Sequence, residues 1–355
     1  MPQSRNTLLS VIIPTLNEAE HLPFLLAELK QQQNILLEII VGDGGSTDAT
    51  RSVAESSGAA FVCAMRGRGA QMNTAALQAS GTYFLFLHAD SRIDDPNLLS
   101  NALHAQMTTQ SEPDRIAGHF RLCFIRSSEL NAMAYRYAEE KTAFNRVNTT
   151  NGDQGLLLSS EFFRHLGGFD ESMAFLEDQR IAEKIRSQGK WITLPGYLKT
   201  SARRFEAEGF HRRYILMSMM MGLHSIGEDQ FFARAPGVYQ LQQETGTLFL
   251  TPFFALIWRM MLEQWRLRGS IRVFSLLGRY IRQNSWQMFY FFDIRFRPQL
   301  GKGRYPFLNF HDRVFAPCTN FRVCNALTGL FCFVWFMGIL APYFWIVDYK
   351  RKNDI

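Results

Sequence analysis

Side chains that could bind a metal ion follow directly after an apolar segment in residues 83–92, YFLFLHADSR. The apolar part, residues 83–87, has the length of a buried strand and is too short for a typical helix. His88 and Asp90 come next, and in an open α/β sheet ligands bind outside the carboxyl ends of the strands. A carboxylate there, close to an imidazole, suits a hard divalent cation that carries phosphate oxygens. The simpler interpretation is that Asp90 caps a helix, because a turn signal, Asp-Asp-Pro, follows it.

Two further groups could meet at the same edge of such a sheet. Asp43 follows a second apolar segment, residues 36–41, and stands in a glycine-rich turn, GDGGSTDAT. Arg66 and Arg68 lie in the turn RGRG, where backbone amides and guanidinium groups can bind the same phosphate. By itself RGRG is more simply explained as a solvated basic turn, but beside Asp43 and Asp90 it predicts a phosphate site.

A pair of carboxylates, Glu177 and Asp178, stands near the start of a predicted helix within residues 173–190. Carboxylates occupy the first turn of a helix for electrostatic reasons alone, so a purely structural role is a strong alternative. The functional interpretation is that one of them is a general base that takes the proton of an acceptor hydroxyl.

The elements that must position these residues alternate between strands and helices. We expect buried strands over residues 8–13, 36–41, 60–64 and 83–87, with a helix after each of the first three. This alternation predicts an α/β fold with a doubly wound, mostly parallel sheet flanked by helices. No GxGxxG follows the first strand and no GxxxxGK[ST] occurs, which disfavours a dinucleotide oxidoreductase and a P-loop NTPase.

Four motifs in fixed order carry a resemblance: SVIIPTLNEAEHL, EIIVGDGGSTDAT, RGRGAQMNTAA and FLHADSR. Together they resemble the nucleotide-binding half of family 2 glycosyltransferases, which have the GT-A fold. The likeness is greatest to a bacterial subgroup with HAD-S/T where the wider family has Asp-x-Asp. It covers roughly residues 10–209. It implies a nucleotide-sugar donor of the UDP or GDP type and a divalent cation, Mn²⁺ or Mg²⁺, as cofactor.

The resemblance also implies roles for residues at matching positions. Glu18 and Asp43 would contact the donor nucleoside, and Asp178, beside Glu177, would be the general base. The turn that holds Asp153 would lie beside the donor sugar and the acceptor. The candidates for nucleotide-sugar binding are Pro14, Glu18, Asp43, Arg66, Arg68, Asn73, Asp153, Gln154, Arg203 and Arg204; those for catalysis are Asp178 and Glu177; those for the metal are Asp90 and His88.

Two of these assignments leave an alternative open. An aspartate in a turn, such as Asp153, is commonplace without any function. Arg203 and Arg204 are expected to end a strand, on which adjacent side chains cannot share one face. We therefore expect only one of these arginines to enter the site, where it would bind diphosphate or an acidic acceptor group.

The sequence departs from the family pattern at two positions. Gly44 stands in place of the second aspartate of DDxS, and His88 in place of the first aspartate of Asp-x-Asp. Neutral imidazole is a poor ligand for Mg²⁺ and an acceptable one for Mn²⁺. We therefore assign Asp90 as the metal ligand and expect His88 beside the ligands or in packing.

Composition sets the class of protein and its compartment. The 355 residues carry a net charge of +6, with 47% hydrophobic and 14% aromatic residues. Five scattered cysteines without CxxC spacing indicate a reducing compartment and neither a disulfide framework nor a zinc site. The N-terminus reads as a first strand and not as a signal peptide, so we expect a cytoplasmic domain.

The C-terminal third predicts contact with a membrane. We expect a glycosyltransferase domain over residues 1–209 and a helical, basic and aromatic region over residues 210–355, in which residues 271–292 form a basic amphipathic helix. Residues 326–347 are apolar and long enough to span a bilayer. A single span would place the following Lys-Arg-Lys and the catalytic domain on opposite sides, against the positive-inside rule. We prefer a re-entrant or in-plane hairpin bent at Pro342, with a buried helix pair of a soluble protein as the alternative.

These observations predict a metal-dependent inverting glycosyltransferase of the bacterial cell envelope, at the cytoplasmic face of the inner membrane. Its acceptor would be a hydroxyl of a lipid-linked or membrane-resident molecule, because a phosphate acceptor needs no base. A polyprenyl-phosphate sugar synthase is the first alternative. A degenerate GT-A domain that serves as a membrane scaffold or binding module is the second. Nucleic-acid binding is not expected, because the cations follow membrane-type amphipathicity and no nucleic-acid module is present.

Overall fold

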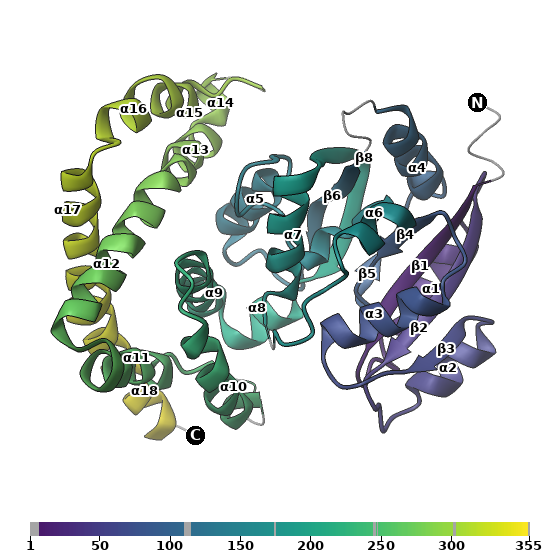
Figure 1. The fold of residues 1–355 in the computed structure, drawn as a ribbon, viewed down its shortest axis with the longest axis horizontal. Coiled ribbons are helices and arrows are strands. Elements are labelled where there is room, and N and C mark those ends of the chain that lie inside the picture. Colours follow the sequence, from purple (N-terminus) through teal and green to yellow (C-terminus); the bar gives the residue numbers. More distant parts are fainter. Residues whose placement is uncertain are drawn as a thin grey trace. The chain divides into compact units, whose positions relative to one another are not determined.

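The chain forms two units, Met1–Ala202 and Arg203–Ile355 (Figure 1). The computed structural model describes residues 7–109, 115–173, 175–243, 246, 248–300 and 303–353. The boundary that we predicted, after residue 209, lies a few residues C-terminal to the observed boundary after Ala202.

The first unit is built on one mixed sheet with the strand order β3-β2-β1-β4-β7-β6-β8-β5. The pairs β1–β2, β1–β4, β2–β3 and β6–β8 are parallel, and β4–β7, β6–β7 and β5–β8 are antiparallel. The strands are β1 (Leu8–Thr15), β2 (Leu36–Asp43), β3 (Ala60–Cys63), β4 (Tyr83–Phe86), β5 (Ser91–Arg92), β6 (Ile116–Ile125), β7 (Leu156–Ser159) and β8 (Lys190–Ser201).

Helices cover both faces of this sheet, which confirms the predicted α/β class. They are α1 (Leu22–Lys30), α2 (Thr50–Ser56), α3 (Arg68–Gln78), α4 (Leu98–Thr108), α5 (Ala132–Lys141), the 3₁₀ turn η2 (Gly152–Gln154), α6 (Ser160–His165) and α7 (Glu177–Gln188). Along β4, Phe84 and Phe86 pack into one core while Leu85 packs into the other. Because successive side chains of a strand point to opposite faces, a short apolar strand can serve two cores.

The end of the first unit differs from the sequence-based expectation. We expected Arg203 and Arg204 to end a strand. The structure instead has the single long strand β8, and Arg203 and Arg204 begin the helix α8 (Arg203–Glu208) of the second unit. The expectation of strand geometry for the two arginines is therefore wrong.

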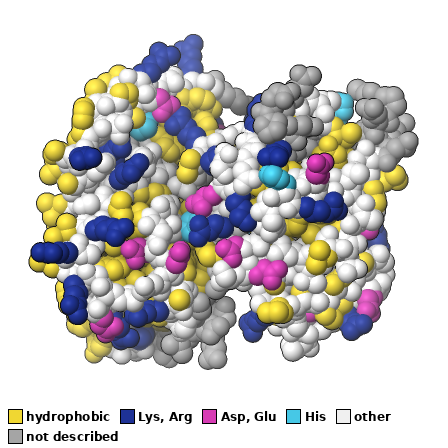
Figure 2. All heavy atoms as spheres, in the orientation of Figure 1, with side chains coloured by type: hydrophobic (Ala, Val, Ile, Leu, Met, Phe, Trp, Pro, Cys, Tyr) yellow, Lys and Arg dark blue, Asp and Glu magenta, His cyan; other side chains and the backbone are white. Residues whose placement is uncertain are grey.

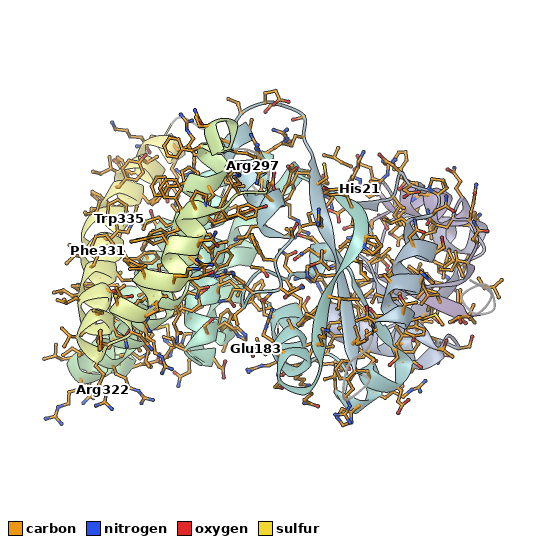
Figure 3. The ribbon with its side chains drawn as sticks, turned by 90° about the horizontal axis from the view of Figure 1, so that it is seen from above. His21, Glu183, Arg297, Arg322, Phe331 and Trp335 are labelled. Atoms are coloured by element: carbon orange, nitrogen blue, oxygen red, sulfur yellow. The ribbon has the colours of Figure 1, made fainter. Side chains whose placement is uncertain are left out.

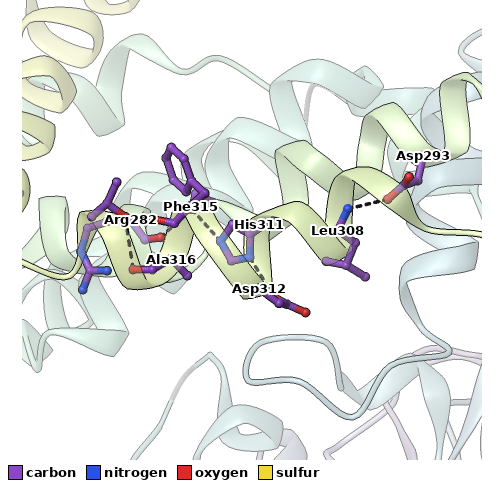
Figure 4. Close-up of polar contacts among 9 residues, drawn as sticks. Arg282, Asp293, Leu308, His311, Asp312, Phe315 and Ala316 are labelled. Atoms are coloured by element: carbon purple, nitrogen blue, oxygen red, sulfur yellow. Dashed lines mark hydrogen bonds and ion pairs between the residues drawn. The ribbon is translucent and has the colours of Figure 1, made fainter.

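The regular elements described in the second unit are all helical. After α8 come α9 (Phe210–Ser225), α10 (Asp229–Gln243), α11 (Thr251–Met260), η3 (Met261–Trp265), α12 (Arg266–Gln283), α13 (Trp286–Arg295), α14 (Arg297–Leu300), α15 (Pro306–Phe310), η4 (His311–Phe315), α16 (Ala316–Thr319), α17 (Arg322–Phe333), η5 (Val334–Leu340) and α18 (Ala341–Asn353). Polar groups stabilise the start of α15, where the Asp293 carboxylate accepts from the amides of Phe307 and Leu308. Within η4, His311 Nδ1 lies 2.8 Å from Asp312 Oδ1; Figure 4 shows this pair and the bond from Leu308 to Asp293.

The apolar C-terminal segment is one continuous helix, Arg322–Asn353, made of α17, η5 and α18. The hairpin that we expected at Pro342 is therefore wrong. Proline lacks an amide hydrogen and clashes with the preceding turn of an α-helix. The π-helical stretch η5 lies directly before Pro342 and widens that turn, so the helix continues past the proline. Only 11% of its apolar window is buried, which also argues against a buried helix pair.

Candidate active site

The Asp43 carboxylate, at the end of β2, holds the turn that follows it. Its Oδ2 accepts from the amides of Gly45 and Ser46 at 2.9 and 2.8 Å, and its Oδ1 accepts from Thr15 Oγ1 at 3.0 Å and Ser46 Oγ at 2.5 Å. Burial raises the pKa of this carboxyl, but these four hydrogen bonds to the charged form outweigh burial, and the pKa lies below its usual value. Asp43 is thus a fixed negative charge that shapes the β2 turn.

The turn after β1 is tied to the turn after β2 by side chains. Asn17 has a left-handed backbone with φ 56°, its amide donates to Ser46 Oγ at 2.8 Å, and its side-chain oxygen accepts from the Thr47 amide at 2.8 Å. The amide of Glu18 donates to Thr50 Oγ1 at 2.9 Å. These bonds place Glu18 beside the Asp43 turn. Pro14 is buried within β1 and pairs in register with a glycine of β2.

Gly44 lies against a side chain that the sequence did not single out. Gln71, on α3, donates through Nε2 to the Thr15 carbonyl at 2.5 Å. A Cβ on Gly44 would lie 2.5 Å from this Nε2 atom. The space of the side chain missing at position 44 is therefore occupied by the Gln71 amide, and a larger residue there requires Gln71 to move.

The first turn of α3 carries Arg68, which pairs with a carboxylate of α7. Arg68 Nε lies 2.8 Å from Glu177 Oε1, and the two side chains are 45% and 2% exposed. The contact is an ion pair without hydrogen-bond geometry, because Glu177 Oε1 makes no hydrogen bond. Burial raises the pKa of Glu177, and the Asp178 charge adds to this effect while Arg68 opposes it. Arg66 lies exposed just before this turn.

Asn73, further along α3, forms hydrogen bonds with the loop after α6. Its Nδ2 donates to the Phe169 carbonyl at 2.9 Å and to Glu171 Oε1 at 2.8 Å, and its Oδ1 accepts from the Phe169 amide at 2.9 Å. Asn73 therefore positions this loop, which has the sequence LGGFDE (residues 166–171).

His88, two residues after β4, lies between Asp153 and the backbone of Gly152. Its Nδ1 is 2.8 Å from Asp153 Oδ1, and a Cβ on Gly152 would lie 2.8 Å from its Nε2. Burial lowers the pKa of His88, but the hydrogen bond and charge of Asp153, with a contribution from Asp90, outweigh it and the pKa is raised.

Asp178 reaches the same turn from the N-terminus of α7. Its Oδ2 accepts from the Gly152 amide at 2.7 Å, and its Oδ1 accepts from the Gln179 amide at 2.9 Å. Leu176, just before the helix, has a left-handed backbone with φ 63°. Glu177 is buried while Asp178 is partly exposed, so Asp178 is the member of the pair that a substrate can reach.

Gln154 is part of the support for this turn. It is fully buried, its Nε2 lies 2.9 Å from His119 Nδ1 and donates to the carbonyls of Phe120 and Thr142, and its Oε1 accepts from the Asn151 amide at 2.8 Å. These bonds assign Gln154 to holding the turn, whereas Asp153 beside it is 43% exposed.

A small cavity of about 30 Å³ lies beneath these groups, which is room for about one or two water molecules. His88, Gly152, Glu177 and Asp178 line it together with apolar side chains that include Phe86, Leu156, Phe169 and Trp191. This apolar floor is the physical cause of the raised Glu177 pKa, because it disfavours the charged carboxylate.

The groups near Asp90 fit a cation that is shared with phosphate oxygens. Among the residues described by the structure, no three His, Cys, Asp or Glu side chains group closely enough to hold a metal by themselves. Mg²⁺ often binds through one or two carboxylates and the phosphates of a substrate, and the partly exposed Asp90 fits this pattern. Both ring nitrogens of His88 already face protein groups, Nδ1 facing Asp153 and Nε2 facing Gly152, which favours Asp90 over His88 as the ligand.

The structure brings together residues from four of the predicted motifs. Glu18 lies beside the Asp43 turn, and Arg68, His88, Asp153, Glu177 and Asp178 form a second group around Gly152. Arg203 and Arg204 belong to the second unit. Sequence reasoning missed Gln71 and Gly152, whose importance comes from contacts with distant residues.

Comparison with known proteins supports the class. Residues 10–112 match the model of the family described as Glycosyl transferase family 2. This stretch runs from β1 into the region after α4 and contains Asp43, Arg68 and Asp90. The match assigns these residues to a glycosyltransferase type of domain and covers less than a third of the chain.

Two curated relatives carry the same class name. An uncharacterised glycosyltransferase of Rickettsia prowazekii is 26% identical over 179 residues, and one of Rickettsia typhi is 27% identical over 179 residues. Each alignment covers 48% of this chain and 56% of the relative, so the chain spans about half the length of the curated relatives that it matches.

Two solved structures have a partly similar arrangement. S. aureus TarS 1-349 in complex with UDP has a TM-score of 0.47 and 16% identity, over 93% of this chain and 91% of that chain. Glucosyl-3-phosphoglycerate synthase from Mycobacterium tuberculosis, in complex with Mn²⁺, UDP and its product, has a TM-score of 0.39 and 18% identity, over 55% of this chain and 71% of that chain.

Proposed function

We propose that this chain is a metal-dependent inverting glycosyltransferase that uses a nucleotide-diphosphate sugar. The observation that carries the proposal is the meeting of α3 and α7 beside the end of β4. There Arg68 pairs with Glu177, and Asp178 and His88 both contact Gly152. A cation, a buried carboxylate and a reachable carboxylate beside a strand end are the groups that glycosyl transfer to a hydroxyl requires.

The donor would lie along the carboxyl ends of β1, β2 and β4. Glu18 and the Asp43 turn would hold the nucleoside, and Arg66 and Arg68 would meet the diphosphate. Glu177 pairs with Arg68 at 2.8 Å from Nε, which holds a guanidinium near the end of β4 before the donor arrives. A divalent cation at Asp90 would supply positive charge for the diphosphate leaving group.

The chemical step would be a single displacement. The acceptor hydroxyl oxygen attacks the anomeric carbon, the bond from that carbon to the diphosphate oxygen breaks, and the hydroxyl proton passes to Asp178. The nucleotide diphosphate leaves with the electron pair, and the anomeric configuration inverts. Arg68 would stabilise the negative charge that develops on the leaving group.

The acceptor would be a hydroxyl of a lipid-linked or membrane-resident molecule of the bacterial cell envelope, at the cytoplasmic face of the inner membrane. The apolar helix Arg322–Asn353 supports a membrane-resident acceptor. We also propose that the chain belongs to the bacterial subgroup with HAD-S/T in place of Asp-x-Asp, on the basis of residues 88–91.

Binding of donors tests the first half of the proposal. A panel of UDP and GDP sugars with Mn²⁺ is screened for thermal stabilisation, which reports ligands that bind the folded state. We expect stabilisation by one nucleotide class, and its loss in Asp90→Ala when Mn²⁺ is present. If titration calorimetry with UDP or GDP plus Mn²⁺ detects no binding, the chain is a scaffold and not an enzyme.

Turnover tests the second half. With the donor found in that screen, Asp178→Asn should lose transfer to a hydroxyl acceptor. If Asp178→Asn keeps nearly full turnover with a polyprenyl phosphate while Asp90→Ala does not, the chain is a polyprenyl-phosphate sugar synthase, because a phosphate acceptor is already deprotonated.

A further inference from the structure

The helix Arg322–Asn353 exposes large apolar side chains over its whole length. Phe331, Trp335 and Trp345 are 65%, 46% and 62% exposed. Figure 3 shows Arg322, Phe331 and Trp335 on the outer side of this helix, away from the rest of the second unit. An exposed apolar face of this extent on a folded protein indicates an interaction surface.

On its opposite side, the N-terminal half of the same helix packs against α12. A Cβ on Gly278 of α12 would overlap the backbone of Gly329, so α12 and α17 cross in backbone contact. Phe333 and Phe274 meet edge to face with ring centroids 5.1 Å apart. Beside them, Arg282 of α12 donates through Nε to Asn325 Oδ1 at 2.6 Å.

The C-terminal half of the helix is also attached to other helices of the unit. Asp348 is 2% exposed and accepts from the amides of Leu250 and Thr251 at 3.0 and 2.9 Å. It also pairs with Arg212 Nη1 at 2.5 Å, and the Arg212 guanidinium lies over the ring of Phe344. The helix is therefore attached to its unit at both ends and not at one end only.

This attachment argues that Arg322–Asn353 does not cross a membrane by itself. If Arg322–Asn353 crossed the hydrocarbon, α12 would have to cross with it, because the two are in backbone contact. The exposed arginines of α12, which include Arg268, Arg272 and Arg279, would then enter the hydrocarbon without partners in the described part of the chain. Charges in that position are strongly unfavourable.

We propose that the exposed face of Arg322–Asn353 lies flat in the interface of a bilayer that contains anionic lipids. Trp335, Tyr343, Trp345 and Tyr349 are amphipathic side chains of the kind that prefer the headgroup region. Arg322 stands at one end of the helix, and Lys350, Arg351 and Lys352 stand at the other, all exposed, which favours anionic headgroups. Figure 2 shows apolar and cationic side chains interspersed over the visible face of this unit. The proposal does not depend on the transferase activity.

The test uses the full chain and preformed vesicles of phosphatidylcholine with or without phosphatidylglycerol. Flotation should recover the protein with the anionic vesicles and much less of it with the neutral ones. The variant Phe331→Gln/Trp335→Gln should lower the partition coefficient at least about tenfold, and Lys350→Gln/Arg351→Gln/Lys352→Gln on the order of 100-fold on anionic vesicles. Leu77→Gln, at an 83% exposed position in α3 of the first unit, is the matched control and should bind like the wild type.

Three results would overturn the proposal. One is equal binding by the two face variants and the wild type. Another is protection of a C-terminal tag from protease added outside the vesicles, which indicates a span. The third is a dimer in sedimentation that Phe331→Gln/Trp335→Gln dissociates and that does not bind vesicles, which assigns the face to a second copy. Nucleotide-sugar turnover with a soluble acceptor, measured separately, distinguishes a failure here from a failure of the proposed activity.

Discussion

The Nε atom of Arg68 lies 2.8 Å from the Oε1 atom of Glu177, which joins the first turn of α3 to the first turn of α7. The partners are 109 residues apart in numbering, from 68 to 177, and only one of them is exposed to solvent. The two adjacent carboxylates of α7 therefore have different predicted roles: Glu177 positions the Arg68 guanidinium, and Asp178 remains available for the acceptor hydroxyl.

This division predicts different kinetic effects for the two carboxylates. Asp178→Asn should lower kcat about 10²- to 10⁴-fold, since it removes the general base. Glu177→Gln should mainly raise the KM for the nucleotide sugar, by about tenfold, because Arg68 loses its orientation toward a charged ligand. Steady-state kinetics with the donor varied measures both. Glu183→Gln, on the same helix and 50% exposed, is the control. Equal effects on kcat and KM in the two site variants would contradict the division.

The contact between Gly44 and Gln71 predicts a non-additive pair of mutations. Gly44→Ala should destabilise the protein by about 1–3 kcal/mol, because its Cβ would lie 2.5 Å from Gln71 Nε2. In the background of Gln71→Ala the same substitution should cost much less, since the amide that it meets is gone. Urea unfolding of the four proteins gives the coupling free energy. Strict additivity would show that the two residues do not share this space.

Asp43 predicts a loss of stability at acid pH. Its pKa in the folded protein is below the ordinary value of about 4, so its charged form stabilises the fold above that pH. This contribution is lost as the pH falls through the folded pKa. The difference in free energy of unfolding between wild type and Asp43→Asn should therefore be constant above about pH 5 and shrink below about pH 4. Urea unfolding at several pH values measures it, with the 87% exposed Glu20→Gln as control. A difference that does not change with pH would show that the Asp43 charge is not involved.

The Arg212–Asp348 pair predicts that the C-terminal helix depends on one buried charge. Asp348→Asn should destabilise the second unit by about 3–5 kcal/mol, because it leaves the buried Arg212 without its counter-charge. Asp312→Asn, at a 40% exposed side chain, should cost less than about 1 kcal/mol. Denaturation followed by circular dichroism measures the change in the free energy of unfolding. If the two units unfold separately, the change should appear in the transition of the second unit. A cost for Asp348→Asn as small as that of Asp312→Asn would mean that the helix is held by packing alone.

The sequence by itself determined the elements of the sheet. The apolar segments at 8–13, 36–41 and 83–87 became β1, β2 and β4, and His88, Asp90 and Asp43 came at strand ends as predicted. These features are local, because the length of an apolar run and the residues that stop it decide whether a strand forms and where it ends.

The tertiary structure alone decided which side chains meet. Three contacts join elements far apart in the sequence: Arg68 pairs with Glu177, Gln71 packs against Gly44, and Gln154 bonds to His119. The path of Arg322–Asn353 through Pro342 was also decided there, since α12, α11 and α9 hold the helix on both sides of the proline. Such contacts depend on how packed elements are placed against one another in space, and no local pattern of residue types contains that information.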